Sequence, residues 1–325
     1  MTAVSVILCT RNGRSKKFLD EALRSVLGQS VPPAEVILVD DGSSDGTAGW
    51  VAETFPLVRV LPNLGRGLAA ARNTGIRAAS HPWIAFIDDD DVWNPDKLAC
   101  QLAQASNSDR PEMTIWVAMA AMIQGSRATR ETDLSPPTYW ARWPVCLLGC
   151  PVPASGALLA ASLLKRVGPF DESIQCGSAY QYWIRSLLAG ASIRYSDRVL
   201  ILLRRHPAQM TALDKVPANM LDGDRMCAPF LEMLPPPVAR RISCGSKLIR
   251  WRTLLWRSGP AAAARYWANT SLGSGSPGWR TVAFFLLDTA ACRAPLNLSR
   301  RLREKASRLL AGASAETDSL SIPVG

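Results

Sequence analysis

The sequence predicts an α/β fold built around a mostly parallel β-sheet and followed by a helical region. Four short apolar segments are rich in β-branched residues and run into polar residues or glycine, which is typical of buried strands: 4–10, 35–41, 58–61 and 83–89. Helical sequence lies between them, at 16–30, 43–55 and 67–80. Strands that alternate with helices in this way form parallel pairs joined by right-handed crossovers.

The following residues continue this alternation before the pattern becomes helical. A strand is expected near 114–122, between loops at 106–112 and 125–138. Further expected elements are a strand, short helix and turn over 151–173, a helix over 179–190 that ends at Gly190, and closing strands at 192–195 and 199–205. After Lys215 the pattern is helical, with breaks at 235–237 and 271–278.

The length of 325 residues exceeds one typical domain but falls short of two full-sized ones. We expect an α/β domain over 1–214, a basic helical region over 215–312 and a flexible tail over 313–325. The composition, 48% hydrophobic and 20% charged, excludes a largely disordered chain.

The net charge of +10 is concentrated in the C-terminal third. From Lys215 onward there are 16 lysines and arginines against 7 acidic residues, which gives +9 and leaves +1 before it. This asymmetry favours an anionic partner, either a membrane surface or a phosphate-bearing substrate. Residues 247–259 alternate cationic residues with tryptophan and leucine and could form a basic amphipathic helix at an anionic membrane. The alternative is a solvated helical face; nucleic acid is not expected, because no nucleic-acid motif accompanies the charge.

The eight cysteines are scattered, several of them in apolar runs, and they form no CxxC pair or Cys/His cluster. They are expected to be free, buried thiols. With no signal peptide recognised at Met1, the expected location is the cytoplasm, with the inner face of the membrane as an alternative. The apolar run at 281–292 is about half the length that a transmembrane helix needs, and it contains Asp288.

Four consecutive carboxylates, Asp88 to Asp91, follow the strand expected at 83–89. Like charges this close repel one another unless a cation neutralises them. A hard cation such as Mn²⁺ or Mg²⁺, shared between carboxylate and phosphate oxygens, would satisfy the cluster. The alternative is a solvated acidic turn in which Asp90 or Asp91 caps the next helix.

A second acidic segment, VDDGSSDGT at 39–47, also follows a buried strand. Carboxylates at a strand end can accept hydrogen bonds from a nucleobase or from ribose hydroxyls. Since ligands of such sheets bind at the carboxyl ends of strands, we predict a nucleotide site there. The candidate nucleotide-binding residues of these strand ends are Thr10, Arg11, Asn12, Asp40, Asp41 and Asp89.

Several ordered stretches together resemble one family: VSVILCTRN, LRSVLGQSVPPAEVILVDDGSSDGT, GLAAARNTGI, WIAFIDDDDVWNPDKL and, later, SGALLAASLLKRVGPFDES. Residues 4–98 resemble the inverting glycosyltransferase family 2, whose fold is GT-A. The resemblance implies that Thr10, Asp40 and Asp41 contact the base and ribose, and that Arg72 lies near the nucleotide. It also implies that Asp88 and Asp90 hold the metal and the diphosphate.

The family usually supplies a catalytic base from a Glu-Asp pair after the FDES segment. The aligned stretch here is GSAYQYWIR at 177–185, which has Ser178 and Ala179 in place of that pair. Neither residue can act as a general base near neutral pH. Asp171 and Glu172 are the nearest alternative bases. The other interpretations are an acceptor that is acidic enough to need no base, and a domain that binds its ligand without turnover.

His206 follows the last expected strand, where the family commonly has an Arg/His-bearing motif near the diphosphate or metal. Its imidazole could complete a metal site, and Arg204 or Arg205 could neutralise phosphate. The alternative is a surface histidine before a proline.

These residues predict a metal-dependent transferase that moves a sugar from a nucleoside-diphosphate sugar, with UDP as the expected nucleotide, to an unidentified acceptor hydroxyl. Its setting would be polysaccharide or glycoconjugate biosynthesis. No GxGxxG follows the first strand and no GxxxxGK[ST] occurs, which argues against a dehydrogenase and a P-loop kinase. The absence of a Gly- and Arg-rich first loop argues against a nucleotidyltransferase. A sugar-nucleotide-binding or scaffold protein of the same fold is the alternative.

Overall fold

The computed structural model describes residues 3–124, 127–128, 141–206, 209 and 216–257. The chain divides into two compact units, Met1–Cys227 and Ala228–Gly325. The predicted boundary at 214/215 stays a prediction, and the predicted tail at 313–325 and break at 271–278 lie outside the described residues.

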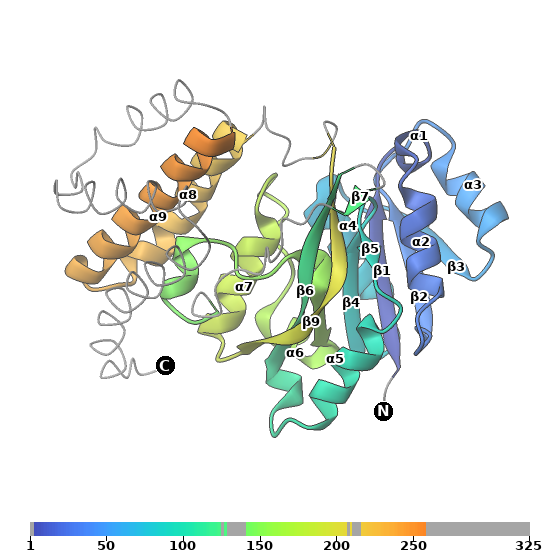
Figure 1. Ribbon diagram of the computed structural model, residues 1–325, viewed down its shortest axis with the longest axis horizontal. Helices are drawn as coiled ribbons and strands as arrows, with labels where there is room; N and C mark the ends of the chain where they lie inside the picture. Colours follow the sequence, from blue (N-terminus) through green and yellow to red (C-terminus); the bar gives the residue numbers. More distant parts are fainter. Residues whose placement is uncertain (1–2, 125–126, 129–140, 207–208, 210–215, 258–325) are drawn as a thin grey trace. The chain divides into compact units, whose positions relative to one another are not determined.

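Four parallel strands form the first half of the sheet, in the order β3-β2-β1-β4 (Figure 1). They are β1 (Val4–Thr10), β2 (Glu35–Asp40), β3 (Val58–Pro62) and β4 (Trp83–Asp88), close to the predicted ranges. The connections between them contain α1 (Gly13–Lys16), α2 (Leu19–Leu27), α3 (Thr47–Thr54) and α4 (Gly67–Ala78).

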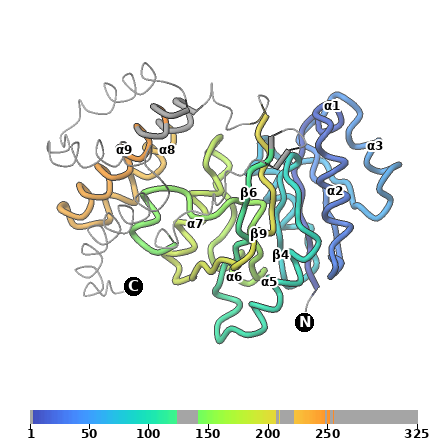
Figure 2. Tube along the Cα trace, in the orientation of Figure 1, coloured from blue at the N-terminus to red at the C-terminus, as the bar shows by residue number. Residues whose placement is uncertain are grey.

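The sheet continues from β4 through β8 (Ala157–Ala160), β6 (Thr114–Gln124), β9 (Ser192–Arg205) and β5 (Val92–Trp93). β8 is antiparallel to both of its neighbours and β5 is antiparallel to β9, whereas β6 and β9 are parallel. β6 and β9 lie side by side although they are far apart in the sequence (Figure 2). The predicted α/β fold with a mostly parallel sheet flanked by helices is therefore confirmed.

Three predicted elements are corrected by the structure. The helix expected at 16–30 is the shorter α2, which is separated from α1 because Lys17 adopts the left-handed conformation (φ 64°). The two closing strands are one strand, β9, whose register with β6 shifts near Met119; there the Ser196 hydroxyl accepts a hydrogen bond from the Met119 N–H (2.9 Å). The expected loop at 125–138 contains a short strand, β7 (Arg127–Ala128), which pairs with β6.

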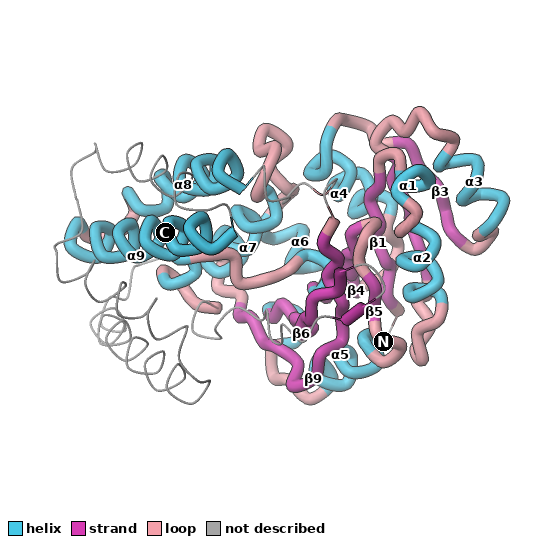
Figure 3. The backbone as a smooth tube through the Cα atoms, turned by 45° about the horizontal axis from the view of Figure 1, so that its top comes forward, coloured by secondary structure: helices cyan, strands magenta, loops and turns pink. Residues whose placement is uncertain are grey.

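Helices and short 3₁₀ turns complete the first unit around the strands, which Figure 3 shows in magenta. The remaining elements of this unit are α5 (Lys97–Ser106), α6 (Ala161–Val167), α7 (Ser178–Leu188), and the 3₁₀ turns η1 (Pro111–Met113), η3 (Val145–Leu148) and η4 (Ala154–Gly156). The seven cysteines of the described part are free thiols, as predicted, but only Cys9, Cys146 and Cys227 are buried.

Two apolar cores lie on opposite faces of the sheet because successive strand residues point to opposite sides. Val6 and Leu8 of β1 belong to one core, whereas Ile7 and Cys9 belong to the other. On the second face α4 packs very closely on β1: a Cβ atom added to Gly75 would lie 2.4 Å from Ile7 Cγ2. This close packing fixes α4, and with it Arg72, relative to the ends of the parallel strands.

Among the described residues two helices follow β9: α8 (Val216–Glu232), which includes the boundary of the units, and α9 (Pro236–Arg257). α9 begins at the predicted break, since proline is well tolerated in the first turn of a helix. Leu254 is completely buried and Arg250 is largely buried, so the arginines of this segment are not all solvated. None of the described helices has the length and apolar character that crossing a membrane requires.

Candidate functional site

The carboxyl ends of β1, β2 and β4 bring most of the predicted residues together. In the sheet register Thr10 pairs with Asp40, and Cys9 pairs with Asp88. The four carboxylates of 88–91, which we call the Asp loop, therefore begin beside the end of β1. Each of the four has a different partner, which gives each a different chemical environment.

Asp88 is paired with the arginine of α4. Its Oδ1 accepts a hydrogen bond from Arg72 Nη2 at 3.0 Å. The Arg72 side chain is 4% exposed and its guanidinium lies 5.7 Å from the centre of the Phe170 ring, whereas the Asp88 side chain is 38% exposed. A buried arginine beside an accessible carboxylate can hold phosphate oxygens next to a cation.

Asp89 is neutralised by residues that precede it by more than 70 positions. Thr10 Oγ1 donates to Asp89 Oδ2 at 2.6 Å, and Lys16 Nζ lies 2.9 Å from the same oxygen. The sequence did not single out Lys16. The only signal for it was the cluster of cationic residues directly after β1.

Asp90 faces the predicted histidine, with its Oδ2 atom 2.9 Å from His206 Nε2. Burial and the neighbouring Asp88 raise the pKa of the Asp90 carboxyl from 3.8 to about 6, while the hydrogen bond to His206 opposes that rise. The Phe18 ring packs against the imidazole, with ring centres 4.8 Å apart. His206 is therefore part of the Asp loop environment rather than an isolated surface residue.

Asp91 is buried and makes structural contacts. Ser155 Oγ donates to its Oδ2 at 2.5 Å, and the backbone N–H of Arg204 donates to its Oδ1 at 3.0 Å. Burial, followed by the charges of Asp90 and Asp88, raises the pKa of this carboxyl well above its ordinary value. The alternative in which Asp90 or Asp91 caps the next helix is wrong, because Asp96 occupies the N-cap position of α5.

The two carboxylates after β2 also differ. Asp40 Oδ1 accepts hydrogen bonds from the N–H (3.0 Å) and the hydroxyl of Ser43, within its own turn. Asp41 reaches further: it accepts from Asn63 Nδ2 at 2.6 Å and from the N–H of Gly67, the first residue of α4, at 3.0 and 3.1 Å. Asp41 therefore joins the end of β2 to the start of α4.

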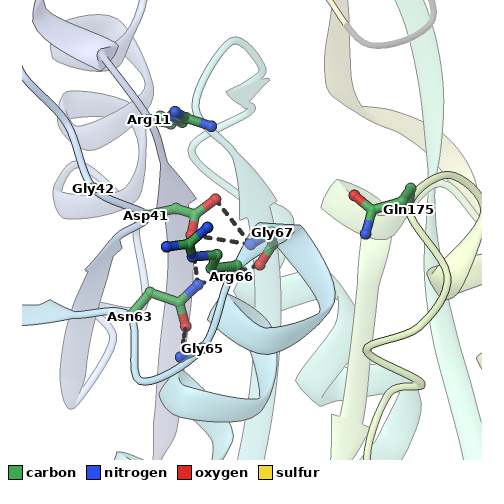
Figure 4. Close-up of a pocket in the computed structure, with 8 residues that line it drawn as sticks. All are labelled: Arg11, Asp41, Gly42, Asn63, Gly65, Arg66, Gly67 and Gln175. Carbon is green, nitrogen blue, oxygen red and sulfur yellow. Dashed lines mark hydrogen bonds between the residues drawn. The ribbon is translucent and has the colours of Figure 1, made fainter.

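Asp41 also lines a cleft of about 630 Å³ (Figure 4). The lining residues are Arg11, Asp41, Gly42, Asn63, Gly65, Arg66, Gly67 and Gln175, with Gln175 across the cleft from Asp41. Two of them, Arg11 and Arg66, are exposed cations. Asn63, Arg66 and Gln175 were not predicted, because loop residues carry no periodic signal.

Asn12, which stays a predicted nucleotide contact, connects two loops. Its Oδ1 accepts from the Ser44 N–H and its own N–H donates to Ser43 Oγ, both at 2.8 Å. It does so from the left-handed conformation (φ 54°), which asparagine tolerates better than most residues. Asn12 thus shapes the rim of the cleft.

The two candidate bases lie in a turn anchored to α4. Asp171 Oδ1 accepts from the N–H (3.0 Å) and Oγ (2.6 Å) of Ser173, and these bonds lower the pKa of Asp171. Glu172 Oε1 accepts from Asn73 Nδ2 at 2.8 Å. Asp171 is consequently a weak base, and Glu172 is an exposed residue that is partly engaged by α4.

The positions of the family's usual acidic pair lie at the start of α7. Ser178 is its first residue and is buried, while Ala179 packs partly buried against the core. Gln181 accepts from Arg185 Nε at 2.9 Å, and Arg185 in turn donates to the carbonyls of Val167 and Pro169. The first two turns of α7 therefore contain no carboxylate.

The chain is similar to known glycosyltransferases. Residues 5–131 match the model of "Glycosyl transferase family 2". An uncharacterised glycosyltransferase of Rickettsia prowazekii is 26% identical over 213 residues, which are 64% of this chain and 65% of that protein. This chain thus aligns with just under two thirds of that relative's length. The Escherichia coli protein WfgD, named as a UDP-Glc:α-D-GlcNAc-diphosphoundecaprenol β-1,3-glucosyltransferase, is 36% identical over 102 residues, which are 31% of this chain and 40% of WfgD.

Solved structures support the fold. A crystal structure of residues 1–349 of S. aureus TarS superposes with a TM-score of 0.55 at 19% identity, covering 82% of this chain and 78% of that one. The same TarS fragment in complex with UDP-GlcNAc superposes with a TM-score of 0.50 at 16% identity, covering 81% and 83%. Residues 5–131 therefore match glycosyl transferase family 2, and the chain shares the fold of TarS.

Proposed function

We propose that the protein is a metal-dependent glycosyltransferase that moves a sugar from a nucleoside-diphosphate sugar, with UDP as the nucleotide, to an acceptor hydroxyl with inversion at the anomeric carbon. One observation carries the proposal: the Asp loop, Arg72 and the cleft beside Asp41 meet at the ends of three adjacent parallel strands. UDP as the nucleotide is supported by the name of the E. coli relative.

The nucleoside would occupy the cleft, where Arg11 and Arg66 offer cationic side chains and Asp41 and Asn63 offer hydrogen-bonding groups. The diphosphate would extend toward Arg72 and the Asp loop. Lys16 is a further cation on that path, since it contacts Asp89. An anionic ligand is favoured there because Arg11 and Arg66 of the cleft are exposed cations.

The residues fit a Mn²⁺ or Mg²⁺ ion that is also held by substrate. Within the described part, no three side chains of histidine, cysteine, aspartate or glutamate are arranged to hold a metal by themselves. Asp90 and His206 already face each other and offer an oxygen and a nitrogen, and Asp88 offers a second carboxylate beside them. A metal bound there would act as a Lewis acid toward the leaving diphosphate.

In the proposed reaction an acceptor oxygen forms a bond to the anomeric carbon while the bond from that carbon to the diphosphate oxygen breaks. The acceptor proton passes to a base, for which Glu172 is the better candidate in the 171–172 turn, because the bonds from Ser173 lower the pKa of Asp171. The vacant positions at the start of α7 favour a second candidate function, a sugar-nucleotide-binding protein without turnover.

Calorimetry with UDP would test the proposal. We expect UDP to bind the wild type tightly with Mn²⁺ and weakly in EDTA, and the Asp90→Ala variant to lose the metal-dependent part. Equal affinity in Mn²⁺ and EDTA would refute the metal site. Turnover of UDP-sugars in the wild type would separate the enzyme from the binding protein, for which binding without turnover is expected.

Two further proposals concern location. We propose a cytoplasmic protein whose basic C-terminal third associates with an anionic membrane surface through residues 247–259. Most of these residues belong to α9. Co-sedimentation with anionic and with neutral vesicles would test this, and equal binding to both would refute it.

A further inference from the structure

Asp91 differs from the other members of the Asp loop because both of its carboxylate oxygens are engaged inside the protein. Its exposed fraction is 5%, and its partners come from two distant parts of the chain, η4 and the end of β9. Asp91 thus connects the Asp loop to η4 and to the end of β9.

The bond from Asp91 to Arg204 extends the pairing between β5 and β9. The last ladder pair toward the site is Val92 with Leu202. One residue before Val92, the Asp91 carboxylate takes the place of a backbone carbonyl and accepts the N–H of Arg204 at 3.0 Å. This bond fixes the backbone two residues before His206, whose imidazole contacts Asp90.

The Arg204 side chain strengthens the same junction. Its Nε donates to the Asp90 carbonyl at 3.0 Å, its Nη2 pairs with Glu21, and its guanidinium lies 4.6 Å from the centre of the Phe18 ring. The end of β9 is therefore attached to the Asp loop through both the backbone and the side chain of one residue.

Ser155 forms hydrogen bonds with both ends of the Asp loop. Its hydroxyl donates to Asp91 at 2.5 Å and accepts from the N–H of Asp88 at 3.0 Å, so one oxygen contacts both ends of the Asp loop. The Ser155 carbonyl accepts from Trp93 Nε1 at 2.9 Å. Both ends of the four-residue loop are thus held by a single buried hydroxyl group.

We propose that Asp91 and Ser155 are positioning residues that hold Asp90 and His206 together for a divalent cation and the diphosphate it accompanies. This inference rests on the proposed function. Asp91 acts through the backbone of Arg204 on His206, and Ser155 acts through the backbone of Asp88 and the carboxylate of Asp91. In this role neither side chain needs to touch substrate.

The experiment compares the Mn²⁺ affinity of the wild type with that of variants at Asp91 and Ser155, in the presence of UDP. Binding is measured by calorimetry and by the electron paramagnetic resonance of bound Mn²⁺. Loss of residues that orient metal ligands typically reduces metal affinity about 10- to 100-fold. We expect a loss of this size in Asp91→Ala and a smaller one in Ser155→Ala. Asp91→Asn keeps an oxygen for the Arg204 N–H and should recover part of the affinity. Asp96→Ala, which removes an exposed carboxylate from the adjacent segment, should bind Mn²⁺ as the wild type does.

A double-variant comparison tests the route of the effect. If Asp91 acts through His206, then Asp91→Ala combined with His206→Ala should bind Mn²⁺ no more weakly than His206→Ala alone. Fully additive losses would overturn the inference. So would an Asp91→Ala or Asp91→Asn protein that melts at a lower temperature yet binds Mn²⁺ with wild-type affinity and spectrum. Failure of the wild type itself to bind Mn²⁺ with UDP would instead refute the proposed function, and with it this inference.

Discussion

Removal of the Asp41 carboxylate should destabilise the first unit, because this group supports the start of α4. Asp41→Ala removes the acceptor of the Gly67 N–H, an interaction at a helix N-terminus that is worth about 0.5–2 kcal/mol. It also removes the acceptor of the Asn63 amide at 2.6 Å, and hydrogen bonds to charged groups contribute about 1.5–3 kcal/mol. The two contributions share one carboxylate and are not fully additive, so we expect a loss of about 2–4 kcal/mol in the free energy of unfolding.

Urea unfolding followed by circular dichroism measures this loss, and the adjacent carboxylate supplies the control. Among the described residues, the Asp40 carboxylate accepts hydrogen bonds only from Ser43, within one turn, so Asp40→Ala should cost only about 1 kcal/mol. If Asp41→Ala unfolds at the same urea concentration as Asp40→Ala, then Asp41 does not support α4. Its role would then be restricted to contact with a ligand in the cleft.

Three further predictions concern charge. Burial lowers the pKa of Lys97 well below 10.5, so the unfolded chain binds more protons than the folded protein. The free energy of unfolding should therefore rise with pH up to about 10.5. Lys97→Met should flatten this rise in urea titrations, and parallel pH profiles of the wild type and the variant would contradict the prediction. Arg72 donates to Asp88, and in the proposed complex it also contacts phosphate. Arg72→Gln should therefore weaken UDP binding about 10- to 100-fold but leave uridine binding unchanged. Equal losses for UDP and uridine in calorimetry would exclude that role. Ser178→Glu with Ala179→Asp should raise UDP-sugar turnover about 10²- to 10⁴-fold if a general base is what the wild type lacks, and unchanged turnover would refute that explanation.

The strands and their ends were predictable because buried parallel strands leave a local signal. Val6 and Leu8 alternate with Ile7 and Cys9 in a continuous apolar run, and the polar residues begin where the strand ends. Because the carboxyl ends of parallel strands meet at one edge of the sheet, carboxylates that follow neighbouring strands are expected to lie close together. The family resemblance then assigned Asp88 and Asp90 to a metal, and that assignment stays a prediction.

The separate roles within the Asp loop were not predictable, because they depend on partners far away in the sequence. Asp89 meets Lys16 and Thr10, whereas Asp91 meets Ser155 and a backbone amide of β9. Nothing in four consecutive aspartates distinguishes these environments. They follow from the sheet order, which places β8 and η4 beside β4 and β5 beside β9.

Backbone geometry accounts for the other differences. The pattern over 16–30 has helical spacing throughout, yet Lys17 adopts a left-handed conformation that ends α1 and lets Lys16 reach Asp89. A local pattern cannot reveal such a break without a glycine or proline to mark it. Arg66 and Gln175 come from loops, and only the folded chain shows that they line the same cleft.

The absence of a carboxylate at the start of α7 limits how the acceptor proton can be removed. Ser178 is buried in the first turn of the helix, where the helix dipole favours an acidic side chain but burial disfavours a charge. Glu172 is exposed, and among the described residues its carboxylate has one hydrogen bond, from Asn73 on α4, so its second oxygen could accept a proton. An enzyme that relies on Glu172 should lose turnover in Glu172→Gln and keep its affinity for UDP, whereas a binding protein should show no turnover to lose.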